Sequence, residues 1–130
     1  MGLVIRDQQM DAFRRDRERQ FENRALDHLR RNLPRNTTAQ LGEDALRSSI
    51  RKAITKGRVY EITEEYDFLR YLNLMHALGS EFDTDPRYPW AAGILNNEKL
   101  TARRKLDMLT ARAMDMEAEQ RGKYYAAAAH

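Results

Sequence analysis

The chain has 130 residues, of which 33% are charged and 42% are hydrophobic, and it contains no cysteine. A chain of this length fits a single domain, and the lack of cysteine excludes a disulfide framework and a thiolate metal site. No stretch approaches the roughly 20 consecutive apolar residues of a membrane-spanning helix, so we expect no association with a membrane. The apolar run after Met1 is too short for the core of a signal peptide, and a cytoplasmic location is therefore expected.

Residues 7–33 are expected to form a long first helix. Arg17 lies on its apolar line between Phe13 and Phe21, and we expect its guanidinium group to reach a carboxylate of another element or subunit. Pro34 and the polar residues 35–38 predict a loop after this helix. The apolar residues recur at helical spacing, at Met10, Phe13, Phe21, Ala25, Leu29 and Leu33.

Two further helices are expected in the middle of the chain. The first covers about residues 43–56, and Gly57 is expected to end it as a C-cap. A short extended link is expected over residues 59–62. The second helix begins at Thr63, whose hydroxyl group is suited to cap its first turn, and it ends at Gly79.

A short helix that begins at Pro89 and ends at Asn96 and Asn97, and a final helix over about residues 100–120, complete the expected fold. Because no segment alternates regularly enough to be a strand, the sequence predicts an all-α fold. The expected architecture is a small helical bundle of four main helices plus one short helix, with a long first helix, in a single domain over residues 1–125. Residues 126–130 have the composition of a linker or tag remnant.

Charge is distributed unevenly along the chain. Residues 1–60 contain 14 Lys and Arg against 8 Asp and Glu, residues 61–98 contain 2 against 8, and residues 99–130 contain 7 against 4. An acidic middle between two basic ends favours oriented association, because opposite charges steer the encounter of two proteins. The pattern therefore favours binding to a partner protein or to a second copy of the same chain.

Residues 79–90, with the sequence GSEFDTDPRYPW, combine acidic and aromatic side chains in a segment without helical periodicity. The carboxylates alternate as in a helix–loop–helix calcium site, but Pro86 and Ala92 stand where that site needs Gly and Glu, so we expect no metal. One interpretation is a rigid connection in which an aspartate caps a turn and the aromatic rings reach the core. The other is a docking surface for a partner protein. The partner-binding candidates are Glu81, Phe82, Asp83, Asp85, Tyr88 and Trp90, together with Arg17.

The arginines of the first helix support an alternative function, because a basic helix can neutralise the phosphates of a nucleic acid. The sequence pI of about 9.3 agrees with this hypothesis. Acidic residues interleave with these arginines, however, and mixed charges at helical spacing more often form a solvated helix face. Nucleic acid is therefore the less favoured partner. The candidate residues are Arg14, Arg15, Arg19, Arg30 and Arg31.

The sequence contains no recognisable catalytic motif. His28 and His76 are too far apart in sequence to form a metal-binding motif, and neither Ser48 nor Ser49 lies in a nucleophile elbow. A glycine-rich phosphate loop is also missing from the sequence. We therefore expect a protein-interaction module that is not an enzyme and that needs no cofactor.

Three stretches resemble small helical bacterial proteins encoded beside type VI secretion spike and effector genes. They are IRDQQMDAF at residues 5–13, LGEDALRSSIRKAI at residues 41–54, and FLRYLNLMHALGSEFDTDPRYPWAAGIL at residues 68–95. The similarity covers about residues 3–115 and brings no catalytic motif with it. The resemblance implies a cytoplasmic accessory protein, an adaptor or chaperone for a secreted effector or a spike component.

Overall fold

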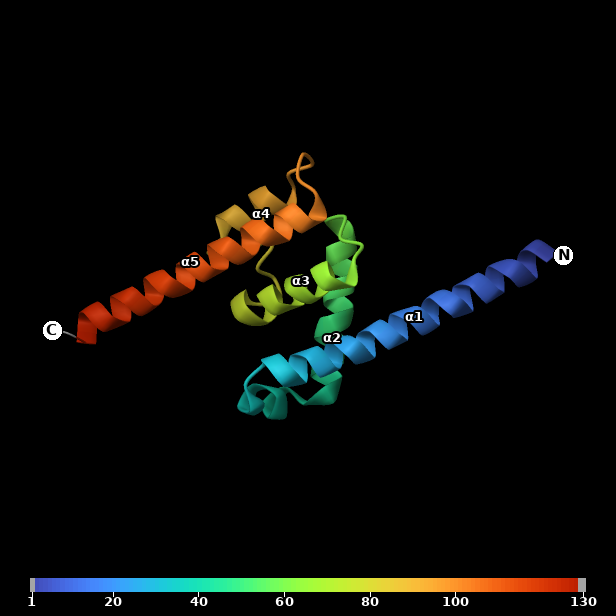
Figure 1. The fold of residues 1–130 in the computed structure, drawn as a ribbon, viewed down its shortest axis with the longest axis horizontal. Coiled ribbons are helices and arrows are strands. Elements are labelled where there is room, and N and C mark those ends of the chain that lie inside the picture. Colours follow the sequence, from blue (N-terminus) through green and yellow to red (C-terminus); the bar gives the residue numbers. More distant parts are fainter. Residues whose placement is uncertain (1, 129–130) are drawn as a thin grey trace. The chain divides into compact units, whose positions relative to one another are not determined.

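The computed structural model describes the backbone of residues 2–128 and the side chains of residues 10–123. These residues contain no strand and form α1 (Gly2–Asn32), α2 (Arg35–Val59), α3 (Glu65–Leu78), α4 (Pro89–Leu95) and α5 (Ala102–Ala128), as Figure 1 shows. The predicted all-α fold, with four long helices and one short helix, is confirmed. The chain divides into two compact units, residues 1–52 (unit 1) and residues 53–130 (unit 2). A single domain over residues 1–125 stays a prediction.

In unit 1, the apolar stripe of α1 is buried only in the second half of the helix. Phe21, Ala25 and Leu29 are buried there, whereas Met10 and Phe13 are each 60% exposed. The predicted helical spacing is therefore correct, and only the part of the stripe from Phe21 to Leu29 is buried. Its first part is a helix surface exposed to solvent.

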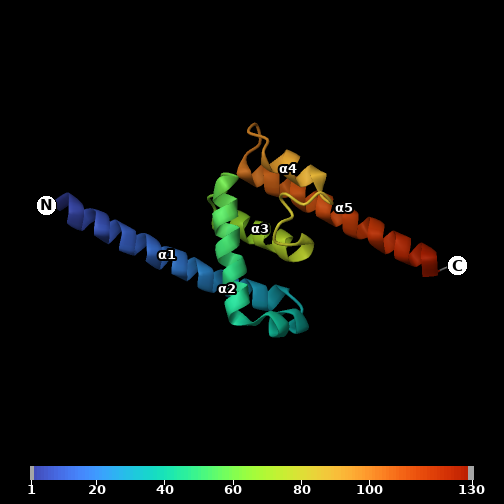
Figure 2. The same cartoon turned by 180° about the vertical axis from the view of Figure 1, so that it is seen from behind.

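The helix α2 begins earlier than the sequence predicts. Residues 35–38 were expected to be a loop, but the N–H groups of Thr37 and Thr38 donate to the Pro34 carbonyl, and the helix starts at Arg35. Gly42 interrupts α2 with φ 75° and ψ 166°, a conformation that only glycine adopts without strain. Figure 2 shows the two helical parts of α2 on either side of this break.

Gly57 does not end α2, in contrast to the prediction. A Cβ atom at this position would lie 2.6 Å from Cε1 of Phe68, so the glycine leaves room for a buried aromatic ring. The helix continues to Val59 and ends in a turn, where the N–H of Ile62 donates to the Gly57 carbonyl over 2.9 Å. The extended link expected over residues 59–62 is therefore a turn, with Glu61 at φ 68°.

Unit 2 contains α3, α4 and α5, and α5 packs against both of the others (Figures 1 and 2). Glu64 precedes the first turn of α3 and makes no side-chain cap, so the predicted Thr63 cap is wrong. The predicted end at Gly79 is confirmed, and its N–H donates to the Met75 carbonyl. The α5 backbone is helical to Ala128, beyond the predicted end near residue 120. Fully buried side chains of this unit include Tyr71, Leu72, Phe82, Leu95, Leu106 and Leu109.

Ion pairs join α3 to the first half of α5. Arg103 donates from Nε to the buried Asp67 carboxylate over 2.7 Å. A second pair lies further along α5, where the Arg70 guanidinium donates to Asp107, also over 2.7 Å. These contacts hold α3 and α5 side by side, where the two helices also share the apolar core. They also fix one end of a groove that lies between the two helices.

Candidate interaction sites

The segment between α3 and α4 is a series of tight turns. Its backbone is held by hydrogen bonds from the N–H groups of Phe82, Thr84 and Tyr88 to the carbonyls three residues earlier in the chain. The Asp85 carboxylate accepts a hydrogen bond from the backbone N–H of Arg87 over 2.9 Å, which is the expected turn cap by an aspartate. Pro89 then begins α4, as predicted. The segment is thus a shaped connection rather than an open loop.

Asp83 lies at the centre of a buried polar network in unit 2. Its carboxylate is 6% exposed and accepts hydrogen bonds from Lys56 Nζ and from the Tyr60 hydroxyl, each over 2.7 Å. Lys56 Nζ also donates to Glu81, over 2.6 Å. A buried charge is tolerated only when it is paired and hydrogen-bonded, and this network satisfies both conditions. It anchors the turn segment to the C-terminal part of α2.

Three aromatic rings pack beside this network. Tyr71 lies between Tyr60 and Phe82, with ring centroids 6.2 Å and 5.1 Å apart, respectively. Burial raises the pKa of Tyr60, and its hydrogen bond to the Asp83 carboxylate raises the pKa further. Burial and the Asp83 charge also raise the pKa of Tyr71 well above its ordinary value. Both phenols therefore stay protonated at pH values that ionise exposed tyrosines.

We expect these two tyrosines to make the fold sensitive to alkali. Because the folded state holds both protons more tightly than the unfolded chain, their contribution to stability is complete below a pH of about 10 and falls as the pH rises above that value. Urea unfolding on both sides of this pH, with tyrosinate absorbance as a second signal, measures the effect. Tyr60→Phe should make the decline shallower. Ionisation of Tyr60 and Tyr71 near pH 10 with an unchanged free energy of unfolding would contradict the expectation.

The structure separates the six candidates of the turn segment into buried and accessible groups. Phe82 and Asp83 are buried, and they hold the segment in place. Tyr88 and Trp90 are half-buried, with ring centroids 5.9 Å apart. Glu81 is exposed but binds Lys56, and Asp85 is half-buried and binds Arg87. The segment therefore combines the two interpretations: its first half is a structural anchor, and its second half contributes accessible aromatic side chains.

A groove of about 470 Å³ lies between α3 and α5 in unit 2, and Tyr88 contributes to its lining. Apolar side chains from one face of each helix line it, namely Leu74, Ala77 and Leu78 from α3 and Ala113, Met114 and Met116 from α5. Met114 is 64% exposed. After Leu109, no residue of α5 up to Lys123 is buried. The apolar stripe of α5 thus continues beyond the part of the helix that the other helices of unit 2 bury.

The groove has an acidic side. Residues 107–120 contain four acidic side chains and one basic side chain, Arg112. Arg112 stacks over Trp90, with its guanidinium carbon 5.5 Å from the ring centroid, and Trp90 does not line the groove. Glu117 lies in the groove lining and pairs with Arg121 over 3.3 Å, but both side chains are about two-thirds exposed and such a pair is weak, whereas Arg70 at the other end is neutralised by Asp107. An apolar ligand with basic flanks therefore matches this surface.

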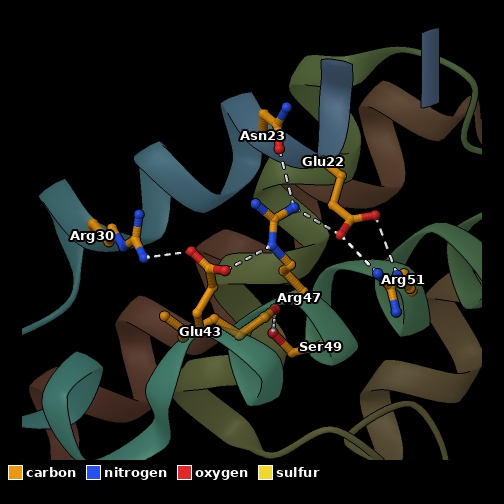
Figure 3. A network of polar contacts seen from close by, with 8 residues as sticks. Glu22, Asn23, Arg30, Glu43, Arg47, Ser49 and Arg51 are labelled. Carbon is orange, nitrogen blue, oxygen red and sulfur yellow. Dashed lines mark hydrogen bonds and ion pairs between the residues drawn. The ribbon is translucent and has the colours of Figure 1, made fainter. Parts of the chain in front are cut away.

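A second site lies in unit 1, where Glu22 joins two arginines of α2 (Figure 3). Its carboxylate accepts hydrogen bonds from Arg47 over 3.0 Å and from Arg51 over 3.1 Å. Arg47 also donates to Asn23 and pairs with Glu43. Burial raises the pKa of Glu22, but the hydrogen bonds from Arg51 and Arg47 outweigh it, and the pKa lies below its ordinary value. Glu22 is therefore ionised at neutral pH.

The five arginines considered for nucleic acid do not form one surface. Arg15 and Arg19 line a shallow pocket together with Arg47 and Arg51. Arg30 binds Glu43 over 3.0 Å, as Figure 3 shows. Arg31 donates to the backbone carbonyl of Asp27 over 3.4 Å. Arg14 is exposed and does not line the pocket.

Arg17 stacks on its neighbour one turn earlier in α1. Its guanidinium carbon lies 4.6 Å from the centroid of the Phe13 ring. The expected reach to a carboxylate is therefore replaced, in the described part of the chain, by a cation–π contact on the helix itself. Contact between Arg17 and a carboxylate of another subunit stays a prediction.

Among the described residues, no group of three or more His, Cys, Asp and Glu side chains lies close enough to hold a metal ion. None of the described helices combines the length and the apolarity required to cross a bilayer. Comparisons with protein-family profiles, with curated proteins and with solved structures found no match. The resemblance to proteins encoded beside type VI secretion genes stays a prediction.

Sequence reasoning missed most of both sites. The spacing of the final helix does not indicate that α3 stops covering Ala113, Met114 and Met116 after Leu78. Arg47 and Arg51 are not among the sequence-predicted site residues. Arg47 and Arg51 are four residues apart, as are Arg15 and Arg19 on the other helix. This shared spacing in the sequence is a signal of two matching basic helix faces.

Proposed function

We propose that this chain is a non-enzymatic protein-interaction module, and that the groove between α3 and α5 binds an amphipathic helix of a partner protein. The observation that carries the proposal is the apolar stripe of α5, which continues beyond Leu109 as solvent-accessible Ala113, Met114 and Met116. Two helices that expose apolar residues along one groove match the helix-in-groove mode of peptide recognition. Methionine suits such a surface because its side chain adapts to different ligands.

The charge around the groove favours one kind of partner helix. Glu117 in the lining, whose exposed pair with Arg121 is weak, and the acidic surplus of residues 107–120 favour basic side chains on the ligand. The proposed ligand is therefore a helix with an apolar face flanked by Lys or Arg. The resemblance noted from the sequence favours a secreted effector or a spike component of a type VI secretion system as the source of this helix, and an adaptor or chaperone role in the cytoplasm.

A matched pair of methionines tests the groove. The probe is a labelled peptide helix with leucines on one face and lysines beside them, and its binding is followed by fluorescence anisotropy. Met114→Gln is expected to weaken binding about tenfold, because it removes apolar contact from the groove. Met108→Gln is the control, since Met108 lies on the same helix with 37% exposure but does not line the groove. The same peptide with glutamates in place of lysines is expected to bind more weakly than the lysine peptide.

Equal losses in the two methionine variants, or tighter binding of the glutamate peptide, would contradict the proposed ligand. A photo-crosslinking residue at position 114, compared with one at position 108, then tests the source of the helix in host cells. An effector or spike component joined only at position 114 supports the secretion role. Adducts that contain a second copy of this chain would instead assign the groove to self-association.

A further inference from the structure

We propose that unit 1 contains a separate binding site for a phosphate monoester group, in the pocket between α1 and α2. The pocket has a volume of about 510 Å³ and is lined by four arginines, two glutamates and Asn23. All of these side chains belong to residues 1–52, whereas the groove belongs to residues 53–130. The inference is therefore independent of the proposed function.

The two helices contribute the arginines in the same way. Arg15 and Arg19 are one turn apart on α1, and Arg47 and Arg51 are one turn apart on α2. Residues at this spacing have Cβ atoms only about 5–6 Å apart, so two guanidinium groups can donate to one bound anion. Like charges at this spacing also repel each other when no anion is bound. On α2 the Glu22 carboxylate already relieves this repulsion, and an anion in the pocket would relieve it on α1.

The α2 arginines are already held in position by the protein. Glu22 is 13% exposed, and it accepts hydrogen bonds from Nη1 of Arg47 and from Nε and Nη2 of Arg51 (Figure 3). Arg47 uses Nη1 and Nε in its contacts with the described residues, which leaves Nη2 as a donor for a ligand. A guanidinium group fixed before binding loses less conformational entropy when the ligand arrives.

The α1 arginines supply the excess charge. Within residues 10–123, neither Arg15 nor Arg19 forms a hydrogen bond or an ion pair, and both are exposed. Four arginines against Glu18 and Glu22 leave a surplus of two positive charges in the lining. A phosphate monoester carries about −1.5 to −2 charges at neutral pH, which matches this surplus. Its oxygens also accept paired hydrogen bonds from guanidinium groups.

The acidic residues of α1 favour a compact ligand over an extended nucleic acid. Asp11, Asp16 and Asp27 lie along the same helix, before, beside and after the pocket residues. A nucleic acid strand that followed the helix would bring its successive phosphates near these carboxylates, which would repel them. A single phosphate group in the pocket contacts the arginines, and no further phosphates are brought near these carboxylates.

Isothermal titration calorimetry with phenyl phosphate, a monoester, tests the site at low ionic strength. We expect Arg15→Gln/Arg19→Gln to weaken binding at least about tenfold, because each variant side chain loses charge-assisted hydrogen bonds. Arg14→Gln/Arg31→Gln removes the same charge from the same helix outside the pocket lining, and it should change binding by less than about twofold. Helical circular dichroism and thermal melting confirm that both variants are folded. Dimethyl phosphate, a singly charged diester, is expected to bind more weakly than the monoester.

Three results would overturn the inference. The first is the absence of binding heat with phenyl phosphate in the parent protein. The second is an equal loss in the two arginine double variants, which would indicate a general effect of net charge. A single-stranded oligonucleotide that binds more tightly than phenyl phosphate, and that depends equally on both arginine pairs, would likewise assign the surface to nucleic acid.

A phosphoserine peptide distinguishes the sources of the monoester. Tighter binding of the peptide than of phenyl phosphate, with the same dependence on Arg15 and Arg19, supports a phosphorylated protein as the ligand. Equal binding of the two probes supports a small phosphorylated molecule. Both results retain the site.

Discussion

Replacing Phe82 by alanine is expected to lower the free energy of unfolding by about 4 kcal/mol, because the substitution leaves a cavity in a packed core. The Phe82 side chain is fully buried, and its ring centroid is 5.1 Å from that of Tyr71. The neighbouring backbone is fixed by the turn hydrogen bonds of the segment, so the site has little freedom to collapse around the cavity. Urea unfolding of the parent and the variant measures the difference.

Trp90→Ala is the matched control for this prediction. Trp90 is a larger aromatic residue of the same stretch, but it is only half-buried and stacks against Arg112. Its loss is expected to cost about 1–2 kcal/mol, since a partly exposed ring loses less transfer free energy when it is removed. A larger loss of stability for Trp90→Ala than for Phe82→Ala would show that the tryptophan, rather than the phenylalanine, anchors the segment.

The helices could be predicted from the sequence because their apolar spacing is a local property. Four long helices and one short helix follow from this spacing, and Pro89 and Gly79 mark real ends. The errors occur where a tertiary contact decides the local structure. Gly57 has the appearance of a terminal cap, but it is needed inside α2 because the Phe68 ring occupies the space of its missing side chain. No feature of the neighbouring sequence indicates that ring.

The candidate sites were less predictable, because their chemistry depends on side chains far apart in sequence. The alternating carboxylates of the turn segment were identified, but Lys56 and Tyr60, which bind Asp83, lie more than twenty residues earlier. Spacing alone cannot distinguish a buried anchor such as Asp83 from a half-buried turn cap such as Asp85. The same limit applies to Arg15 and Arg19, whose neighbours in the pocket come from another helix.

Asp83→Asn is expected to lower the free energy of unfolding by about 3 kcal/mol. The asparagine keeps the shape of the side chain and can still accept a hydrogen bond from Tyr60, but it no longer carries the charge that faces Lys56. Removing one partner of a buried ion pair typically costs about 3–5 kcal/mol. We expect the lower end of this range, because the Lys56 side chain is 19% exposed and keeps its contact with Glu81. Chemical unfolding at neutral pH measures the loss.

Asp85→Asn separates the effect of burial from the effect of charge. Asp85 is paired with Arg87, whose side chain is 72% exposed, so its loss should cost less than about 1 kcal/mol. Adding Lys56→Met to Asp83→Asn should cost less than the sum of the two single substitutions, since the two residues share one interaction. Equal effects of the two aspartates, or fully additive effects of Lys56 and Asp83, would mean that the buried pair does not anchor the segment. The alternative result is a large loss of stability for Asp83→Asn but not for Asp85→Asn, with non-additive effects of Asp83 and Lys56. It would mean that the buried half of the segment stabilises the stretch, while Tyr88 and Trp90 stay accessible to a partner.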